Sequence, residues 1–351
     1  MTNYDIFDEE YYLSQYPWVK PAIDAGIIKS GGDHFTKFGQ AAGFTKVSRY
    51  FDEETYLAQN PDIARFVRTP NNPNAPFASG LDHFIQFGYE EGRTRVSLDY
   101  DEAFYLKRYP VLASFVDNGT FKSGFQHFVK FGAKEGLDAN TFFESEYLLK
   151  HPAVATAVKV GVFKTGAEHY RKFGQFEPAL PFVDVNFFGT SGNDTVQGFG
   201  VENVNIFGVQ YVLDANGTRQ FQSYGSNEFD TLIGGSGRDN FVLAATVPGI
   251  GGSRPTPVSV QFYQGPGFAT IQNFTQGQDT ILLGSTSFDK YIVFPINNNR
   301  DLAIQTNGLP YYTPNGGNQL SYGDTIAVIE GGGNLTLKPL FIPTNISTFV
   351  G

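Results

Sequence analysis

The chain has 351 residues, no cysteine and a formal net charge of −10, with 25 Lys and Arg against 35 Asp and Glu. This length allows two domains with separate cores. The acidic balance argues against nucleic acid as a partner, and the lack of cysteine excludes a disulfide framework. No apolar run of about 18 residues occurs, so we expect no transmembrane segment.

The first half of the chain contains four copies of one two-block pattern. The first block is FDEEYYLSQYP at residues 7–17, and the second is SGGDHFTKFG at residues 30–39. Later copies lie at residues 51–61 and 79–88, 100–110 and 123–132, and 142–152 and 165–174. The repetition predicts a helical array in which each unit packs against its neighbours.

The blocks carry helix-start signals. The predicted N-caps of the first helix are Asp8, Asp52 and Asp101, each after an aromatic residue that can staple onto a tyrosine one turn later. In the fourth copy Phe143 replaces this aspartate, so a less well-defined start is expected. The second block opens with capping-box residues Ser30, Ser79, Ser123 and Thr165. Its closing glycines, Gly39, Gly88, Gly132 and Gly174, are predicted to end the helix.

Each copy also contains one histidine. These residues are His34, His83, His127 and His169, and an aromatic residue follows each of them. Their regular spacing predicts a hydrogen bond between helices at a packed position, and no metal site. The sequence has neither an H-E-x-x-H nor a G-x-S-x-G motif, so we expect no enzyme. A hydrolase with an unrecognised carboxylate pair stays open as a remote alternative.

The repeats resemble a pattern, FDxxYYLxxNPDV…GxxHYxxFGxxEGR, of bacterial surface and secreted proteins, especially cyanobacterial and alphaproteobacterial ones. The segments NPDIARFV and HFIQFGYEEGR of the second copy match it best, and the resemblance covers roughly residues 4–175. It implies a helical adhesion or spacer module and assigns no catalytic residue.

The second half contains three glycine-rich nonapeptides with aspartate at the sixth position. They are GTSGNDTVQ (189–197), GSNEFDTLI (225–233) and GGSGRDNFV (234–242). They resemble the calcium-binding repeat of RTX proteins, G-G-x-G-x-D-x-U-x. The resemblance implies Ca²⁺ as cofactor, with glycines at left-handed φ and carboxylates as hard oxygen ligands. The candidate metal residues are Gly189, Ser191, Asn193, Asp194, Gly225, Asn227, Asp230, Gly234, Ser236, Asp239 and Asp279.

The spacing of the aspartates limits this hypothesis. In the family one coil uses two nonapeptides, so aspartates on one side recur every 18 residues. Asp230 and Asp239 are therefore expected on opposite sides, and the residues 18 positions before them are Val212 and Phe221. We expect one or two calcium sites. Ordinary aspartate turns are the alternative, and turn capping is the alternative role for Asp279 and Asp324.

The sequence thus predicts an α+β protein of two domains. An all-α helical repeat array occupies residues 1–178, a linker 179–188, and an all-β RTX-like parallel β-roll with a β-sandwich-like end 189–351. The acidic start does not resemble a Sec signal peptide, and the closing PTNISTFVG (343–351) is compatible with a type I secretion signal.

These features predict a secreted, non-enzymatic structural protein of the cell surface or extracellular matrix. Self-association into a homo-oligomer or polymer, as a layer or filament, is the expected assembly. The alternative is a lectin-like module that binds surface polysaccharide through residues 308–324, where Tyr, Asn and Gln are frequent.

Overall fold

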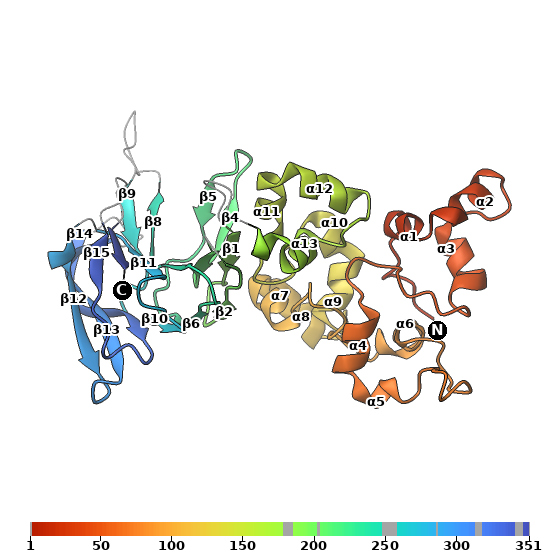
Figure 1. Ribbon diagram of the computed structural model, residues 1–351, viewed down its shortest axis with the longest axis horizontal. Coiled ribbons are helices and arrows are strands. Elements are labelled where there is room, and N and C mark those ends of the chain that lie inside the picture. The colour runs from red at the N-terminus through yellow and green to blue at the C-terminus, as the bar shows by residue number, and fades with distance from the viewer. Residues whose placement is uncertain are drawn as a thin grey trace. The chain divides into compact units, whose positions relative to one another are not determined.

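The computed structural model describes residues 2–177, 185–201, 204–247, 258–285, 287–312, 318–340 and 347–350. Helices occupy the N-terminal part and strands the C-terminal part, which is the predicted two-part α+β layout (Figure 1). The chain forms two compact units. One is Met1–Asn140 with Tyr147–Arg171, and the other is Thr141–Glu146 with Lys172–Gly351.

The helices of the first unit are short. They are α1 (Glu9–Gln15), η1 (Pro17–Val19), α2 (Lys20–Asp24), α3 (Gly31–His34), η2 (Phe35–Gly39), α4 (Glu53–Gln59), α5 (Pro61–Ala64), α6 (Gly80–His83), η3 (Phe84–Gly88), α7 (Glu102–Arg108), α8 (Pro110–Asp117), α9 (Gly124–His127), η4 (Phe128–Gly132), α10 (Ala133–Glu135), α11 (Glu144–Lys150), α12 (Pro152–Lys159) and α13 (Gly166–Lys172), with η5 (Gly174–Phe176) after them. Within the described residues, no helix is long and apolar enough to cross a membrane.

The predicted caps are confirmed. The carboxylate of Asp8 accepts from the Tyr11 N–H at 2.9 Å, and Asp52 and Asp101 do the same at the equivalent positions. The staple also forms, with the Phe7 and Tyr12 ring centroids 5.0 Å apart. In the second block, the Ser79 hydroxyl accepts from the Asp82 N–H at 3.0 Å.

A further carboxylate joins the two helices of each of the first three repeats. In the second repeat, Glu53 of α4 accepts from the Gly80 and Leu81 N–H groups at the start of α6, at 2.6 and 2.9 Å. Glu9 and Glu102 occupy the same position in the first and third repeats. A charged acceptor here satisfies two N–H groups that the helix leaves unpaired.

The predicted helix-closing glycines Gly39, Gly88 and Gly132 are each the last residue of a π-helical turn. None of the three has positive φ, which comes four residues later at Gly43, Gly92 and Gly136. Glycine is required for space. A Cβ on Gly88 would lie 2.7 Å from the Tyr56 hydroxyl, and one on Gly39 would lie 2.8 Å from that of Tyr12.

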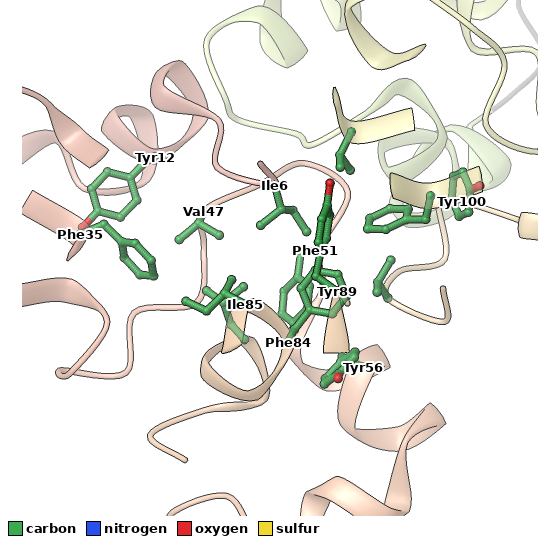
Figure 2. Close-up of a cluster of buried hydrophobic side chains, with 14 of the residues drawn as sticks. Ile6, Tyr12, Phe35, Val47, Phe51, Tyr56, Phe84, Ile85, Tyr89 and Tyr100 are labelled. Atoms are coloured by element: carbon green, nitrogen blue, oxygen red, sulfur yellow. The ribbon is translucent and has the colours of Figure 1, made fainter. Parts of the chain in front are cut away.

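The repeats share one core. Buried aromatic and aliphatic side chains of the first three repeats form a continuous cluster that includes Tyr12, Phe51, Phe84 and Phe128 (Figure 2). Its members come from equivalent positions, so the repeated sequence produces repeated packing.

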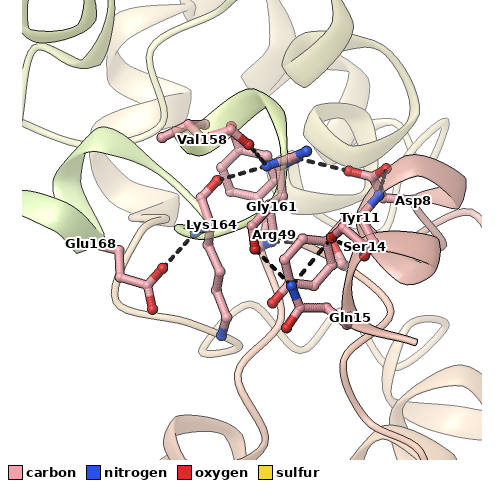
Figure 3. Close-up of polar contacts among 11 residues, drawn as sticks. Asp8, Tyr11, Ser14, Gln15, Arg49, Val158, Gly161, Lys164 and Glu168 are labelled. Atoms are coloured by element: carbon pink, nitrogen blue, oxygen red, sulfur yellow. Dashed lines mark hydrogen bonds and ion pairs between the residues drawn. The ribbon is translucent and has the colours of Figure 1, made fainter. Parts of the chain in front are cut away.

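The contacts also go beyond sequence neighbours, because the fourth repeat packs on the first two (Figure 3). Arg49 Nη1 donates to the Val158 carbonyl at 2.6 Å, and Gln15 Nε2 donates to the Gly161 carbonyl at 2.7 Å. Lys164 Nζ lies 2.9 Å from Asp52 Oδ2. The repeats therefore close into a compact group.

The second unit consists of β1 (Val185–Phe188), β2 (Thr195–Gln197), β3 (Val204–Phe207), β4 (Tyr211–Leu213), β5 (Arg219–Phe221), β6 (Phe229–Ile233), β7 (Asp239–Val242), β8 (Ala244–Val247), β9 (Val258–Gln261), β10 (Phe268–Gln272), β11 (Thr280–Leu283), η6 (Phe288–Lys290), β12 (Tyr291–Ile296), β13 (Asp301–Tyr312), β14 (Asn318–Ile329), β15 (Lys338–Leu340) and β16 (Ser347–Val350). One sheet has the order β1-β3-β7-β11-β16-β15 and the other β12-β13-β14-β10-β6-β2.

The chain alternates between these two sheets. β1, β3, β7 and β11 pair in parallel in one, and β2, β6, β10 and β14 do so in the other. Hairpins β4–β5 and β8–β9 are inserted between coils, and the antiparallel strands β12–β14 and β15–β16 complete the sheets.

The predicted linker is part of this unit where it is described. Residues 179–184 lie outside the described residues, but 185–188 form β1. Residues Thr141–Glu146 also belong here, because the Phe143 N–H donates to the Asn186 carbonyl and the Phe188 N–H to the Thr141 carbonyl. Of the predicted secretion signal, residues 347–350 form β16, and 343–346 and 351 lie outside the described residues.

Candidate metal centre

The four candidate aspartates fall into two pairs, one at the entry to each sheet. Asp194 and Asp230 adjoin the paired strands β2 and β6. Asp239 is the first residue of β7. Asp279 directly precedes β11, the strand that pairs with β7. Neighbouring strands lie about 4.8 Å apart, so the carboxylates of each pair belong to adjacent coils. Asp230 and Asp239 lie in different sheets, as predicted.

The Asp194–Asp230 pair is closed by hydrogen-bond donors. The Asp194 N–H donates to Asp230 Oδ1 at 2.7 Å, and the Tyr263 hydroxyl donates to Asp230 Oδ2 at 2.6 Å. Asp194 Oδ2 accepts from the backbone and the hydroxyl of Thr190. Burial, together with the charge of Asp230, raises the pKa of Tyr263, which therefore stays protonated as a donor. Asp230 Oδ1, Asp230 Oδ2 and Asp194 Oδ2 therefore each accept at least one hydrogen bond.

In the Asp239–Asp279 pair, one buried carboxylate oxygen has no hydrogen-bond partner among the described residues. Asp279 Oδ1 accepts from the Asp239 N–H at 3.0 Å, and its Oδ2 accepts from the Thr275 N–H at 2.7 Å. Asp239 Oδ2 accepts from the Gly235 N–H at 2.7 Å. Asp239 Oδ1 is buried and has no partner among the described residues. Among the four aspartates, Asp239 alone has a fully buried carboxylate oxygen without a hydrogen-bond partner in the described structure.

The electrostatics of this pair favour a positive charge beside it. Both side chains are fully buried, at 0% exposure. Burial, with repulsion from Asp279, raises the pKa of Asp239 to about 7, and burial raises the pKa of Asp279. Two buried carboxylates in contact disfavour double ionisation unless a cation offsets their charge.

The described residues contain no cluster of three or more His, Asp or Glu side chains that could hold a metal ion. An ion at Asp239 and Asp279 would therefore take its remaining ligands from backbone carbonyl groups or water. Ca²⁺ accepts such mixed oxygen coordination, with six to eight ligands.

The other candidate ligands lie in the turns that lead into the strands. Asn193 Oδ1 accepts from the Phe229 N–H of the next coil at 2.8 Å. Ser191 and Ser236 are exposed. Gly225 and Asn227 have positive φ, of 79° and 64°.

The left-handed φ expected of Gly189 and Gly234 is wrong, because neither has positive φ. Both lie against a carboxylate instead. A Cβ on Gly234 would lie 2.9 Å from Asp239 Oδ2, and one on Gly189 the same distance from Asp194 Oδ2. Gly234 thus makes room for the aspartate of its own turn, whereas Gly189 also lies against the Gly208 carbonyl, which a Cβ would approach even more closely.

All four aspartates were predicted as candidate ligands, but their pairing was not, because hairpins β4–β5 and β8–β9 interrupt the regular spacing. The partner of Asp230 lies 36 residues before it, and the partner of Asp239 lies 40 residues after it. Hairpin β4–β5 contains Val212 and Phe221, the positions at which an 18-residue frame places the partners. The alternating apolar segment VSVQFY in residues 258–263 was the available signal for the second hairpin and for Tyr263.

The repeat histidines form the predicted hydrogen bonds. A tyrosine hydroxyl lies 2.7–2.9 Å from Nδ1 of each, in the pairs Tyr12–His34, Tyr56–His83, Tyr105–His127 and Tyr147–His169. Asp324, the further candidate ligand, accepts from the Gly265 N–H at 2.5 Å. Of the predicted polysaccharide segment, residues 313–317 lie outside the described residues.

Comparisons with known proteins do not assign a family or a function to this chain. No protein-family model matches the chain, and no curated protein matches it significantly.

Proposed function

We propose that this protein is a secreted, non-enzymatic calcium-binding structural protein of the cell surface or extracellular matrix. The strand unit would be an RTX-type roll in which a single Ca²⁺ binds at Asp239 and Asp279. The helical repeats would supply the surface through which copies associate into a layer or filament.

The observation that carries the calcium proposal is the orphaned Asp239 Oδ1, buried beside the carboxylate of Asp279. A bound cation would pair this oxygen and offset the repulsion between the two carboxylates. Such a site is formed only in the folded unit, so calcium binding would stabilise the fold outside the cell, where the ion is abundant.

Exposed phenylalanines support the association proposal. Phe87, Phe131 and Phe173 occupy equivalent positions of the second, third and fourth repeats, and about half of each side chain is exposed. An apolar group repeated on one protein suits contact with an identical copy.

Light scattering would then show large particles when calcium is added to chelated protein. Phe87→Ser with Phe131→Ser would reduce them, and particles of undiminished size would refute this role.

The calcium proposal is tested by thermal unfolding of wild type, Asp239→Asn and Asp214→Asn in chelator and in calcium. Asp214 is the matched control, because its carboxylate caps an exposed hairpin turn at Asn216 and Thr218. Calcium at about 100 times its Kd should stabilise wild type and Asp214→Asn by ~2.7 kcal/mol. It should leave Asp239→Asn unchanged. Equal stabilisation of all three proteins, or of none, would refute the site.

A further inference from the structure

The first repeat has an accessible, unpaired histidine nitrogen between exposed aromatic rings. His34 is more than nine-tenths buried, with 8% exposure, and its Nδ1 lies 2.7 Å from the Tyr12 hydroxyl. Its Nε2 has no hydrogen-bond partner among the described residues. It is not among the fully buried atoms that lack a partner, so it is accessible to solvent. Burial lowers the pKa of His34, so the ring is neutral near pH 7.

Two of the surrounding rings are available to a ligand. Trp18, the one tryptophan of the chain, is 58% exposed and stands on the His34 ring at 5.1 Å and 82°. Phe38 is 57% exposed and lies 5.7 Å from the same ring. In the described structure no ring contact joins Trp18 to Phe38, whereas Phe44 packs on both His34 and Trp18, at 6.1 and 5.9 Å.

This arrangement differs from that of the second and third repeats. There, a phenylalanine from the preceding loop stands on the histidine and touches the exposed phenylalanine, as in the pair Phe77–Phe87 at 5.9 Å. The third repeat has the same contact between Phe121 and Phe131. In the first repeat the loop position is Ile28, which is buried, and Trp18 approaches His34 from η1 instead.

We propose that Trp18, His34 and Phe38 bind a neutral sugar ring, as part of a polysaccharide. The apolar C–H face of a pyranose packs on an aromatic ring, and its hydroxyl groups both donate and accept hydrogen bonds. A neutral imidazole nitrogen matches a hydroxyl in either tautomer, because it can act as donor or acceptor. Few polar groups among aromatic walls are typical of small-ligand sites.

Among the described residues, the hydrogen bond of the His34 ring is to the neutral Tyr12 hydroxyl and not to a charged side chain, which favours a neutral ligand. A quaternary ammonium group would require a carboxylate or a denser aromatic cage, and an acidic sugar would require a cation. A proline-rich peptide needs a row of aromatic ridges and several donors to its carbonyl groups, whereas the proposed contact uses the imidazole nitrogen of His34 between two rings. The sugar site lies in the helical unit and goes beyond the proposed calcium function.

The test uses full-length protein in EGTA, so that failure of the calcium proposal does not affect it. Maltohexaose, cellohexaose and xylohexaose are the neutral probes, with polygalacturonate and a decaproline peptide for comparison. Saturable change in the fluorescence of Trp18 with at least one neutral oligosaccharide is expected, because this is the one tryptophan of the chain. Fluorescence unchanged by all three neutral probes, or changed only by polygalacturonate or decaproline, would overturn the proposal.

Variants then locate the site by calorimetric titration with the probe that binds. Trp18→Ala and Phe38→Ala should each weaken binding at least tenfold, while circular dichroism stays unchanged because both side chains are mostly exposed. Phe131→Ala, at the position equivalent to Phe38 in the third repeat, is the matched control and should bind like wild type. Wild-type affinity in Trp18→Ala and Phe38→Ala would overturn the proposal.

Discussion

At the scale of single residues, the two aspartate pairs differ in their donors. Tyr263 donates to Asp230 Oδ2, whereas the equivalent Oδ2 of Asp279 accepts from the Thr275 N–H. Asp239 Oδ1 is fully buried and has no partner in the described structure, which makes it the candidate ion ligand. The nonapeptide pattern alone does not show these differences, because Tyr263 and Thr275 lie outside the nonapeptides.

The raised pKa of Asp239 predicts how stability depends on pH in the absence of calcium. The folded-state pKa of about 7 lies above the ordinary value of 3.8, so the folded protein binds more protons between these limits. Stability should therefore fall as pH rises from about 4 to about 7. Urea unfolding of chelated protein at pH 5.0 and 7.5 measures this, with lower stability expected at pH 7.5.

Asp239→Asn is the control for this pH dependence. The variant removes the titrating charge and keeps an acceptor for the Gly235 N–H, so the loss of stability between pH 5.0 and 7.5 should shrink. Calcium should have the same effect on wild type, because it stabilises the ionised pair. An undiminished pH effect in the variant would assign the titration to other groups.

At the scale of elements, the glutamate that joins the two helices of a repeat should contribute measurably to the stability of the helical unit. Glu53→Ala leaves the Gly80 and Leu81 N–H groups without their charged acceptor. Hydrogen bonds to a charged group contribute ~1.5–3 kcal/mol, so urea unfolding of the helical unit should show a loss of about that size. Glu54→Ala, at the exposed neighbouring position, should change stability by less than ~0.5 kcal/mol. Equal effects would contradict this role of Glu53.

The helix starts were predictable from sequence because caps act within four residues. Asp8 and Ser30 have the expected partners, and the staple follows from the same local spacing. The need for glycine at position 88 was not predictable, because the atom that a Cβ would meet is a tyrosine hydroxyl 32 residues away in sequence. The aspartate pairing failed for the same reason, since inserted hairpins change its spacing from 18 residues to 36 and 40.

At the scale of the whole molecule, each unit is stabilised by contacts between segments that are far apart in its own sequence. In the helical unit, the fourth repeat is held on the first by Arg49, which donates to the Val158 carbonyl and lies 3.2 Å from Asp8. In the strand unit, β1, β3, β7 and β11 pair in parallel in one sheet, and β2, β6, β10 and β14 do so in the other. Antiparallel strands complete both sheets. The two-part layout followed from composition, whereas closure of the repeats depends on contacts more than 100 residues apart.

Arg49→Ala tests the closure of the helical unit. Loss of the Arg49 hydrogen bonds should release the fourth repeat, so hydrogen exchange of α12 should increase about tenfold or more, while the strands β6 and β10 stay protected. Arg65→Ala is the matched control, because Arg65 is exposed and lies over the Phe66 ring. Equal exchange in both variants would show that Arg49 does not hold the closure.

The central claim is that calcium completes the strand unit of a secreted structural protein. Circular dichroism and hydrodynamic size, recorded together in EGTA and in millimolar calcium, test it most directly. Calcium should strengthen the β-sheet signal and increase particle size, and Asp239→Asn should abolish both changes. A β-sheet signal and a size that are identical with and without calcium would contradict it.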